Sequence, residues 1–234
     1  MRTLPLTLLV ALLLVAGPDA EAAVTLVQTA NNTQSGDANV TFGMNTQTGN
    51  AVVVALMHNG GASGTYGISD ATNGAYTQAV IGGSPTLVVI KHFRNITGGF
   101  VNVAIDAPSG GDNWTAWAYE LNGADNSAMV QTGTNGDTGT SHTSSSTGLT
   151  ATGFGVATCI YSGAPTTTAG SGWTRDTAGS GVGHMAQHQI AAFSSNTGPF
   201  TTGSSVDTIC AMGIYPEAAA GGGARGKRTL LGVG

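Results

Sequence analysis

Clusters of glycine, asparagine, serine and aspartate divide the chain into short β-forming runs, and this spacing restricts the fold more than any other feature. Glycine alone supplies 37 of the 234 residues, about twice its usual share. These residues favour tight turns, whereas the β-branched and aromatic residues between them favour strands. No segment longer than about ten residues combines helical periodicity with a helix cap. The pattern therefore predicts an all-β fold.

Some of the runs also indicate where they lie in a sheet. Ala51–Met57 and Leu87–Ile90 are apolar on both faces, which is typical of central strands. Phe100–Asp106 alternates, so its two valines and Ile105 are expected to face the core. The spacing of about eleven runs favours one domain over residues 23–217. We predict a single two-sheet antiparallel β-sandwich, either Ig-like or jelly-roll in topology.

One stretch inside this domain has a different composition. Residues 122–149 are nearly all glycine, threonine, serine, asparagine and aspartate. Such residues are typical of turns and loops. We expect a long surface loop here, or only short edge strands.

The first 22 residues have the features of a secretory signal peptide. Arg2 is the positive N-terminal region, Leu4–Ala16 is apolar, and Ala20-Glu21-Ala22 places small residues at the cleavage positions. The alternative is a membrane anchor, but this apolar run would span only about 20 Å as a helix, against ~30 Å for a bilayer core. We expect cleavage after Ala22 and an exported protein, extracellular or on the cell surface, that does not span a membrane.

Charged residues are scarce, at 8 % of the chain. Between residues 23 and 223, three basic and ten acidic residues give a net charge of −7. Such a surface repels polyanions, so nucleic acid is not expected as a partner. Residues 218–234 form a Gly/Ala-rich tail that carries the basic cluster Arg225–Arg228. We expect this tail to be a solvated terminus, with contact to an acidic neighbour as the alternative.

Cys159 and Cys210 are the only cysteines. They lie in the strand-like runs Phe154–Tyr161 and Val206–Tyr215. Exported proteins meet an oxidising compartment, where an even number of cysteines favours pairing. We predict a Cys159–Cys210 disulfide between neighbouring strands. Two buried thiols that pack as small hydrophobic side chains are the alternative.

Three motifs together resemble those of a group of exported or phage-associated bacterial β-sandwich proteins, Ig-like or jelly-roll-like in fold. They are the apolar strand Val52–Leu56, the turn Ser69–Thr77, and Ala118–Gly123 followed much later by a last strand that ends at Gly213–Pro216. The similarity spans about 24–217, although Asn73-Gly74 reverses the order usual in that turn. The resemblance implies surface attachment or assembly, and it transfers no catalytic residue.

Aromatic residues gather on one predicted strand, 113–121. Trp117 and Tyr119 share a face, whereas Trp114 lies on the other face with two alanines and Glu120. If that face is exposed, its small neighbours leave the indole accessible to a sugar ring. If it is buried, the same alanines permit close packing of sheets. Trp114 and Glu120 are therefore candidate ligand-binding residues for a neutral polysaccharide, with core packing as the alternative.

Histidines provide a weak indication of metal binding. His184 and His188 form an H-x-x-x-H pattern, which on a helix would place both on one face. The surrounding run resembles a strand, in which residues four apart lie about 13 Å from each other. We therefore predict no histidine metal site.

Aspartates in Asn/Gly-rich loops raise the question of calcium. Carboxylates in such loops bind Ca²⁺ in some proteins, but Asx-type turns are the commoner explanation. We predict no cofactor and keep Ca²⁺ as the alternative. The residues concerned are Asp70, Asp112, Asp125 and Asp137.

No catalytic motif is present in the sequence. The G-x-S-x-G elbow of serine hydrolases is absent, and a Glu120–Asp106 pair for glycosidase chemistry would be unremarkable among ten acids. We therefore expect a non-enzymatic exported structural or adhesion module that binds neutral polysaccharide. Two alternatives remain: a secreted hydrolase, and a self-assembling filament in which Val24–Thr29 of one copy completes the sheet of the next.

Overall fold

A computed structural model describes residues 23–59, 65–83, 86–99, 101–108, 113–126, 131–144, 149–163, 166–176, 183–196 and 198–218. Within these ranges the chain forms strands and turns and no helix, which confirms the all-β prediction. Accordingly, no described helix is long and apolar enough to cross a membrane. The predicted signal peptide and all of the predicted tail except Ala218 lie outside the described residues. The strands are β1 (Thr25–Ser35), β2 (Ala38–Thr41), β3 (Ala51–Asn59), β4 (Gly67–Asp70), β5 (Gly74–Ala75), β6 (Thr77–Gly82), β7 (Leu87–Arg94), β8 (Asn102–Asp106), β9 (Asn113–Asn122), β10 (Gln131–Thr143), β11 (Leu149–Tyr161), β12 (Thr167–Ala169), β13 (Thr174–Asp176), β14 (His184–Asn196) and β15 (Pro199–Pro216).

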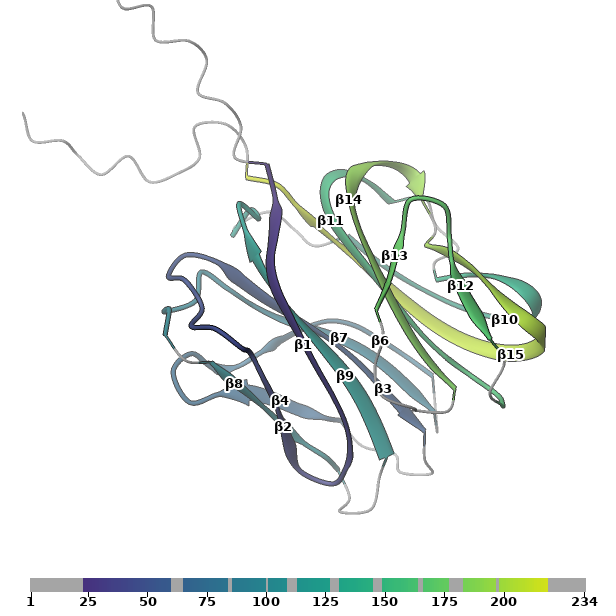
Figure 1. The fold of residues 1–234 in the computed structure, drawn as a ribbon, viewed down its shortest axis with the longest axis horizontal. Helices are drawn as coiled ribbons and strands as arrows, with labels where there is room; N and C mark the ends of the chain where they lie inside the picture. The colour runs from purple at the N-terminus through teal and green to yellow at the C-terminus, as the bar shows by residue number, and fades with distance from the viewer. Residues whose placement is uncertain are drawn as a thin grey trace, which may run out of the picture.

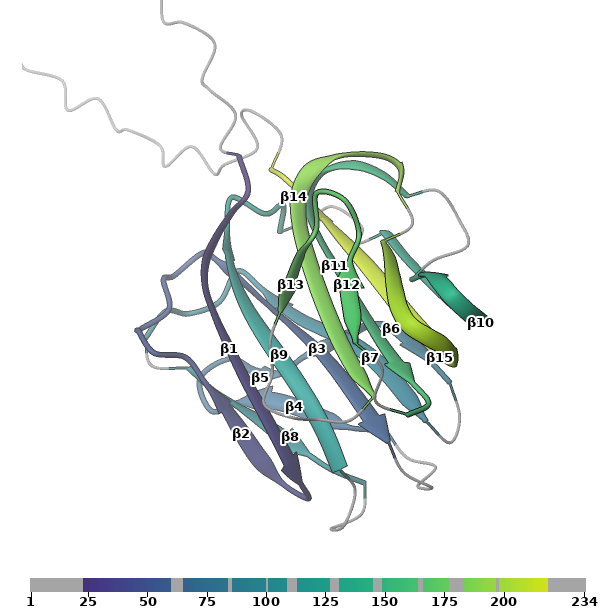
Figure 2. The same ribbon diagram turned by 45° about the vertical axis from the view of Figure 1, so that its right-hand side comes forward.

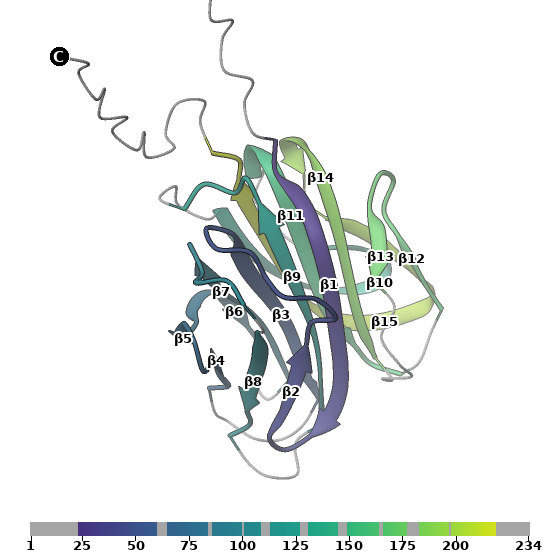
Figure 3. The same cartoon turned by 60° about the vertical axis from the view of Figure 1, so that its left-hand side comes forward.

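The strands form three antiparallel sheets stacked as layers (Figures 1 and 3). The central sheet has the order β1-β9-β3-β7-β6. One of its faces is covered by the four-stranded sheet β2-β8-β4-β5. Its other face is covered by the curled sheet β10-β15-β11-β14-β13, in which β12 also pairs with β15. The predicted antiparallel sandwich is confirmed, with three sheets where two were expected.

The central sheet is apolar on both faces because it is buried on both sides. Along β3, Val52, Val54 and Leu56 pack toward the four-stranded sheet, and the residues between them pack toward the curled sheet. β3 lies between β7 and β9, and β7 between β3 and β6. The prediction that Ala51–Met57 and Leu87–Ile90 are central strands is therefore correct.

The four-stranded sheet is built from short strands with few apolar side chains. Val103 and Ile105 of β8, together with Val101, are almost completely buried against the central sheet, as the alternation predicted. Tyr66 and Ile68, at β4, join the same core. Because these strands are short and β4 and β5 consist largely of turn-forming residues, the sequence did not show that they form a third sheet of their own.

The curled sheet bends so that β13, paired with β14, and β12, paired with β15, lie near each other (Figure 2). The long strand β15 pairs with β12 near Thr202 and with β11 from Thr208 onward. Phe193 and Trp173 pack inside this curl. The predicted disulfide is present: Cys159 and Cys210 are directly opposite each other on β11 and β15, and both are buried.

The segment 122–149 contains a longer strand than its composition suggested. β10 spans thirteen residues and is the edge strand of the curled sheet, paired with β15 along most of its length. Every second residue between Asn135 and Gly139 is half-buried and the others are exposed. Backbone pairing with β15, rather than side-chain hydrophobicity, holds this stretch extended. For this reason the sequence shows no alternation of apolar residues that would have predicted the strand.

Candidate functional site

Trp114 is a core residue and does not form an exposed platform. Its side chain is fully buried among the residues between the central and four-stranded sheets. Its Nε1 donates a hydrogen bond of 2.7 Å to Gly36 O. The prediction of a sugar-stacking surface at Trp114 is therefore wrong, because the third layer covers that face of β9. The alanines beside it, Ala116 and Ala118, permit this close packing, as the alternative proposed.

Glu120 is a buried structural carboxylate. Its side chain is inaccessible to solvent and accepts hydrogen bonds from Gln28 Nε2 (2.6 Å), the backbone N of Gln47 (2.7 Å) and Asn50 Nδ2 (2.6 Å). These donors come from β1 and from the connection between β2 and β3, so Glu120 fastens both to β9. Asp106, the acid considered with it, is exposed on β8 of the four-stranded sheet.

Asp70 forms an Asx-type turn. Its carboxylate accepts hydrogen bonds from the backbone N atoms of Thr72 (2.8 Å) and Asn73 (2.7 Å), and from Tyr76 Oη (2.9 Å). Burial and the Asp70 charge both raise the pKa of Tyr76. The carboxylate is therefore fully used in stabilising the turn between β4 and β5 and in holding Tyr76, which follows β5.

The other aspartates considered for calcium are dispersed. Asp125 donates its backbone N to Pro216 O, Asp137 contacts His142, and Asp112 lies outside the described residues. In the described part of the chain, no three His, Cys, Asp or Glu side chains are grouped to hold a metal ion.

His184 and His188 lie on β14, so the H-x-x-x-H pattern is in a strand, as predicted. His184 Nδ1 is 2.8 Å from Thr115 Oγ1 of β9. His188 Nδ1 is 2.9 Å from Asp176 Oδ1, and the Asp176 carboxylate also accepts a hydrogen bond from Tyr119 Oη (2.7 Å). Burial, followed by the Asp176 charge, raises the pKa of Tyr119. Both histidines therefore connect the curled sheet to the central sheet.

Two histidines are held in their neutral form. Burial, and secondarily the charge of Arg94, lower the pKa of His92 to about 4. Burial, and secondarily the charge of His58, lower the pKa of His184 to about 4. The ring of His92 packs edge-on against Tyr215, between the central and curled sheets.

Asp137, His142 and Thr202 form a chain of hydrogen bonds in the curled sheet. His142 Nδ1 lies 2.5 Å from Asp137 Oδ1, and His142 Nε2 lies 2.9 Å from Thr202 Oγ1. Burial of Asp137 opposes its ionisation, but hydrogen bonds from His142 and Thr208 outweigh this effect and lower its pKa. The order of groups is that of hydrolase triads. However, Thr202 is only 5 % exposed and donates its hydroxyl to Ser204 O, which favours a role in tying β10 to β15.

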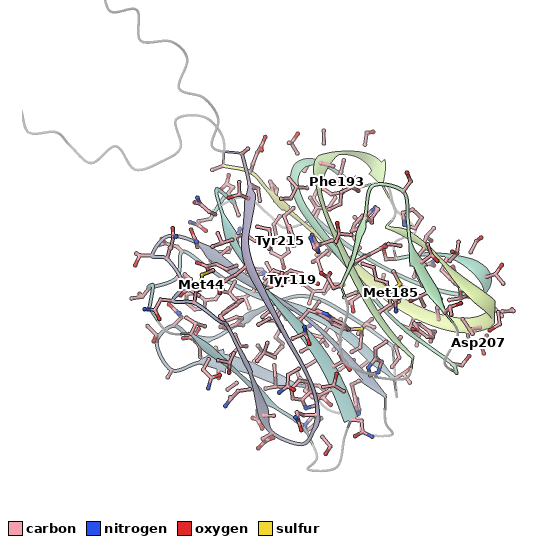
Figure 4. The ribbon with its side chains drawn as sticks, viewed as in Figure 1. Met44, Tyr119, Met185, Phe193, Asp207 and Tyr215 are labelled. Atoms are coloured by element: carbon pink, nitrogen blue, oxygen red, sulfur yellow. A yellow bond between two sulfur atoms is a disulfide. The ribbon has the colours of Figure 1, made fainter. Side chains whose placement is uncertain are left out.

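A pocket of about 290 Å³ lies where the central and curled sheets meet at one end of the molecule. Its apolar lining is formed by Ile160 of β11 and Ile209 of β15. Polar groups come from Ser162, Asp207 and, on the side of the central sheet, Thr86. The pocket also includes Tyr161, Gly163 and Thr208. Figure 4 shows Asp207 at the periphery, away from the interior residues Tyr119 and Tyr215.

Strand register creates the polar side of this pocket. Ser162 follows the last paired residue of β11 and lies beside Asp207 of β15. Ser162 N donates to Asp207 O (3.0 Å), and Asp207 N donates to Ser162 Oγ (3.2 Å). Thr138 Oγ1 on β10 donates to Asp207 Oδ1 (2.6 Å), which fixes the carboxylate.

The sequence did not identify Ser162 or Asp207 as site residues, although a signal for them was present. In an antiparallel pair with Cys159 opposite Cys210, the residue three after the first cysteine faces the residue three before the second. That pair is Ser162 and Asp207. The predicted pairing of Cys159 with Cys210 therefore also fixes the strand register that places the Ser162 hydroxyl beside the Asp207 carboxylate.

Comparison with protein-family models, with curated proteins and with solved structures finds no match for this chain.

Proposed function

We propose that the protein is an exported, non-enzymatic adhesion module that binds neutral polysaccharide at a cell or particle surface. One observation carries the proposal: the buried acids and imidazoles act as ties between strands and layers. Glu120 fastens β1 to β9, Asp137 and His142 join β10 to β15, and His188 with Asp176 joins the curled sheet to Tyr119. Groups used in this way rigidify a scaffold, because each is positioned by partners inside the protein.

The disulfide supports export. Structural disulfides persist in oxidising compartments and are rare where thiols are kept reduced. Cys159 and Cys210 join two strands in the middle of the curled sheet, where the bridge is buried. Together with the signal-peptide features of residues 1–22, this location favours an extracellular protein.

The distribution of cations supports a neutral ligand. Among the described residues the basic side chains are Lys91, Arg94 and Arg175, and each donates a hydrogen bond to a backbone carbonyl oxygen. Lys91 is buried, and this burial lowers its pKa. Within the described part of the chain these three cations form no cluster that would attract acidic glycans, whereas hydroxyls and amides suit neutral sugars.

The experiment is a binding assay with the mature protein, residues 23–234. Insoluble neutral polysaccharides such as cellulose, chitin and starch granules are compared with an acidic gel of cross-linked pectate. We expect retention on at least one neutral polymer, little effect of salt, and no retention on the acidic gel. Retention only on pectate, with elution by salt, would contradict the proposal. Fractionation of cells that express the full chain tests export separately.

A filament joined by strand donation is the second candidate, favoured by the position of β1. This strand follows the predicted cleavage site and lies at the edge of the central sheet, where β9 is its one partner among the described strands. Exchange of an edge strand between copies leaves the rest of a sheet intact. Within one chain, however, Val24 and Leu26 pack into the core that β1 would have to leave. Electron microscopy of the mature protein at high concentration distinguishes filaments from separate particles.

A further inference from the structure

We infer that the pocket at Ser162 and Asp207 is a subsite for a single ring of a neutral sugar, an inference that rests on the proposed function and gives it a location. The pocket is formed where two layers end together. The residues of β11 and β15 that face the central sheet continue the core as far as Ile160 and Ile209. Beyond them, the same face carries Ser162 and Asp207 in place of apolar side chains.

The dimensions of the pocket fit a small ligand. Its volume, about 290 Å³, is at the lower end of the range for small-molecule sites. Gly83 packs beside the lining residue Ile209 in a conformation with φ of +86°. A Cβ added at Gly83 would lie 3.1 Å from the Ile209 side chain and closer still to Thr86 O, so the backbone beside these two lining residues requires glycine.

The polar groups are arranged to meet hydroxyls. Asp207 Oδ1 already accepts a hydrogen bond from Thr138, and no described donor reaches Oδ2. A fixed carboxylate with one oxygen available accepts hydrogen bonds from adjacent ligand hydroxyls. Ser162 and Thr86 add hydroxyls that donate or accept, and the isoleucines provide an apolar surface for ring carbons.

The charge of the pocket selects the class of sugar. Among the described residues of the lining, Asp207 is the only carboxylate and none is basic. A uronic acid or a phosphosugar would be repelled by Asp207. A neutral hexose is therefore the expected occupant, whereas an amine attracted by the carboxylate is the competing ligand that the experiment has to distinguish.

The test is ligand-observed saturation-transfer NMR on the mature protein with glucose, galactose, mannose, N-acetylglucosamine, glucuronate and ethanolamine. Asp207→Asn keeps the acceptor for Thr138 and removes the charge, and Asp106→Asn is the matched control on the four-stranded sheet. We expect at least one neutral sugar to bind the parent and Asp106→Asn. We expect its affinity to fall roughly tenfold to a hundredfold in Asp207→Asn, because a charge-assisted hydrogen bond is lost.

The outcomes separate this inference from the proposed function. If Asp207→Asn binds neutral sugars as tightly as the parent, or if ethanolamine or glucuronate binds in preference to them, the pocket is not a neutral-sugar site. If Asp207→Asn also retains its adhesion to insoluble polysaccharide, the proposed function stands and the pocket is not its site. If neither single sugars nor neutral polysaccharides bind the parent, both proposals fail. Equal melting temperatures of the two variants exclude unfolding as the cause of lost binding.

Discussion

The Cys159–Cys210 bridge is expected to contribute a large part of the stability of the mature protein. Its cysteines are 51 residues apart in the sequence. In the chain-entropy model, closing a loop of this length in the unfolded state stabilises the fold by about 4 kcal/mol. For a domain of this size, that corresponds to a melting temperature roughly 8–16 °C higher than without the bridge.

The measurement is urea unfolding of the parent with the bridge intact and with it reduced, because both states contain the same atoms in the core apart from two hydrogens. Both cysteines are buried, so the reductant has to be added to the unfolded chain before refolding. Alkylation and mass spectrometry then verify the number of free thiols. We expect the reduced protein to be about 4 kcal/mol less stable and its m-value to rise, since the uncrosslinked unfolded chain exposes more surface.

The control is a variant with Cys159→Ala and Cys210→Ala, whose unfolding curve is expected to be the same with and without reductant. A fully reduced parent that loses less than about 1 kcal/mol would refute the entropic reasoning. That result would mean that pairing between β11 and β15 already restricts the unfolded chain.

Three further predictions concern buried polar groups. Because the folded-state pKa values of His92 and His184 are about 4, below an unfolded value of about 6.5, the unfolded chain binds more protons between these limits. The free energy of unfolding is therefore expected to fall as the pH drops from about 6.5 to 4, by up to about 3 kcal/mol for His92. Calorimetry across this pH window measures the loss, and unchanged stability would contradict the prediction. Glu120→Ala leaves three donors without their acceptor and is expected to cost about 3 kcal/mol or more in urea unfolding; a loss below about 1 kcal/mol would contradict its role as a tie. Trp114→Phe removes the hydrogen bond to Gly36 O and part of a buried ring. It is therefore expected to lower the free energy of unfolding by about 1–3 kcal/mol and to leave polysaccharide retention at the parent level. Lost retention in a folded variant would contradict the assignment of Trp114 to the core.

Much of the fold could be predicted because burial leaves a pattern in the sequence. The doubly apolar run Ala51–Met57 requires a sheet covered on both faces, and β3 has such an environment. Alternation in Phe100–Asp106 located the buried valines and Ile105. The pairing of Cys159 with Cys210 followed from their number and from their strand-like surroundings.

The remaining features depend on contacts that are distant in sequence. Trp114 has the same neighbours along its strand whether or not a sheet covers it, so the sequence left its exposure open. The covering sheet contains strands as short as Gly74–Ala75, which no periodicity can reveal. β10 is extended because β15 pairs with it, and its threonines and glycines are equally common in loops.

The disulfide also bears on the candidate site through strand register. Cys159 is paired with Cys210, so Ser162 lies beside Asp207 on the face that continues the core. A slip of one residue between β11 and β15 would turn the side chains of one strand to the opposite face and separate this hydroxyl from the carboxylate. Backbone hydrogen bonds alone do not prevent such a slip in glycine- and threonine-rich strands, because their two faces differ little in hydrophobicity. A covalent bond between directly opposed residues does prevent it. The bridge therefore specifies the geometry of the proposed sugar subsite as well as contributing to stability.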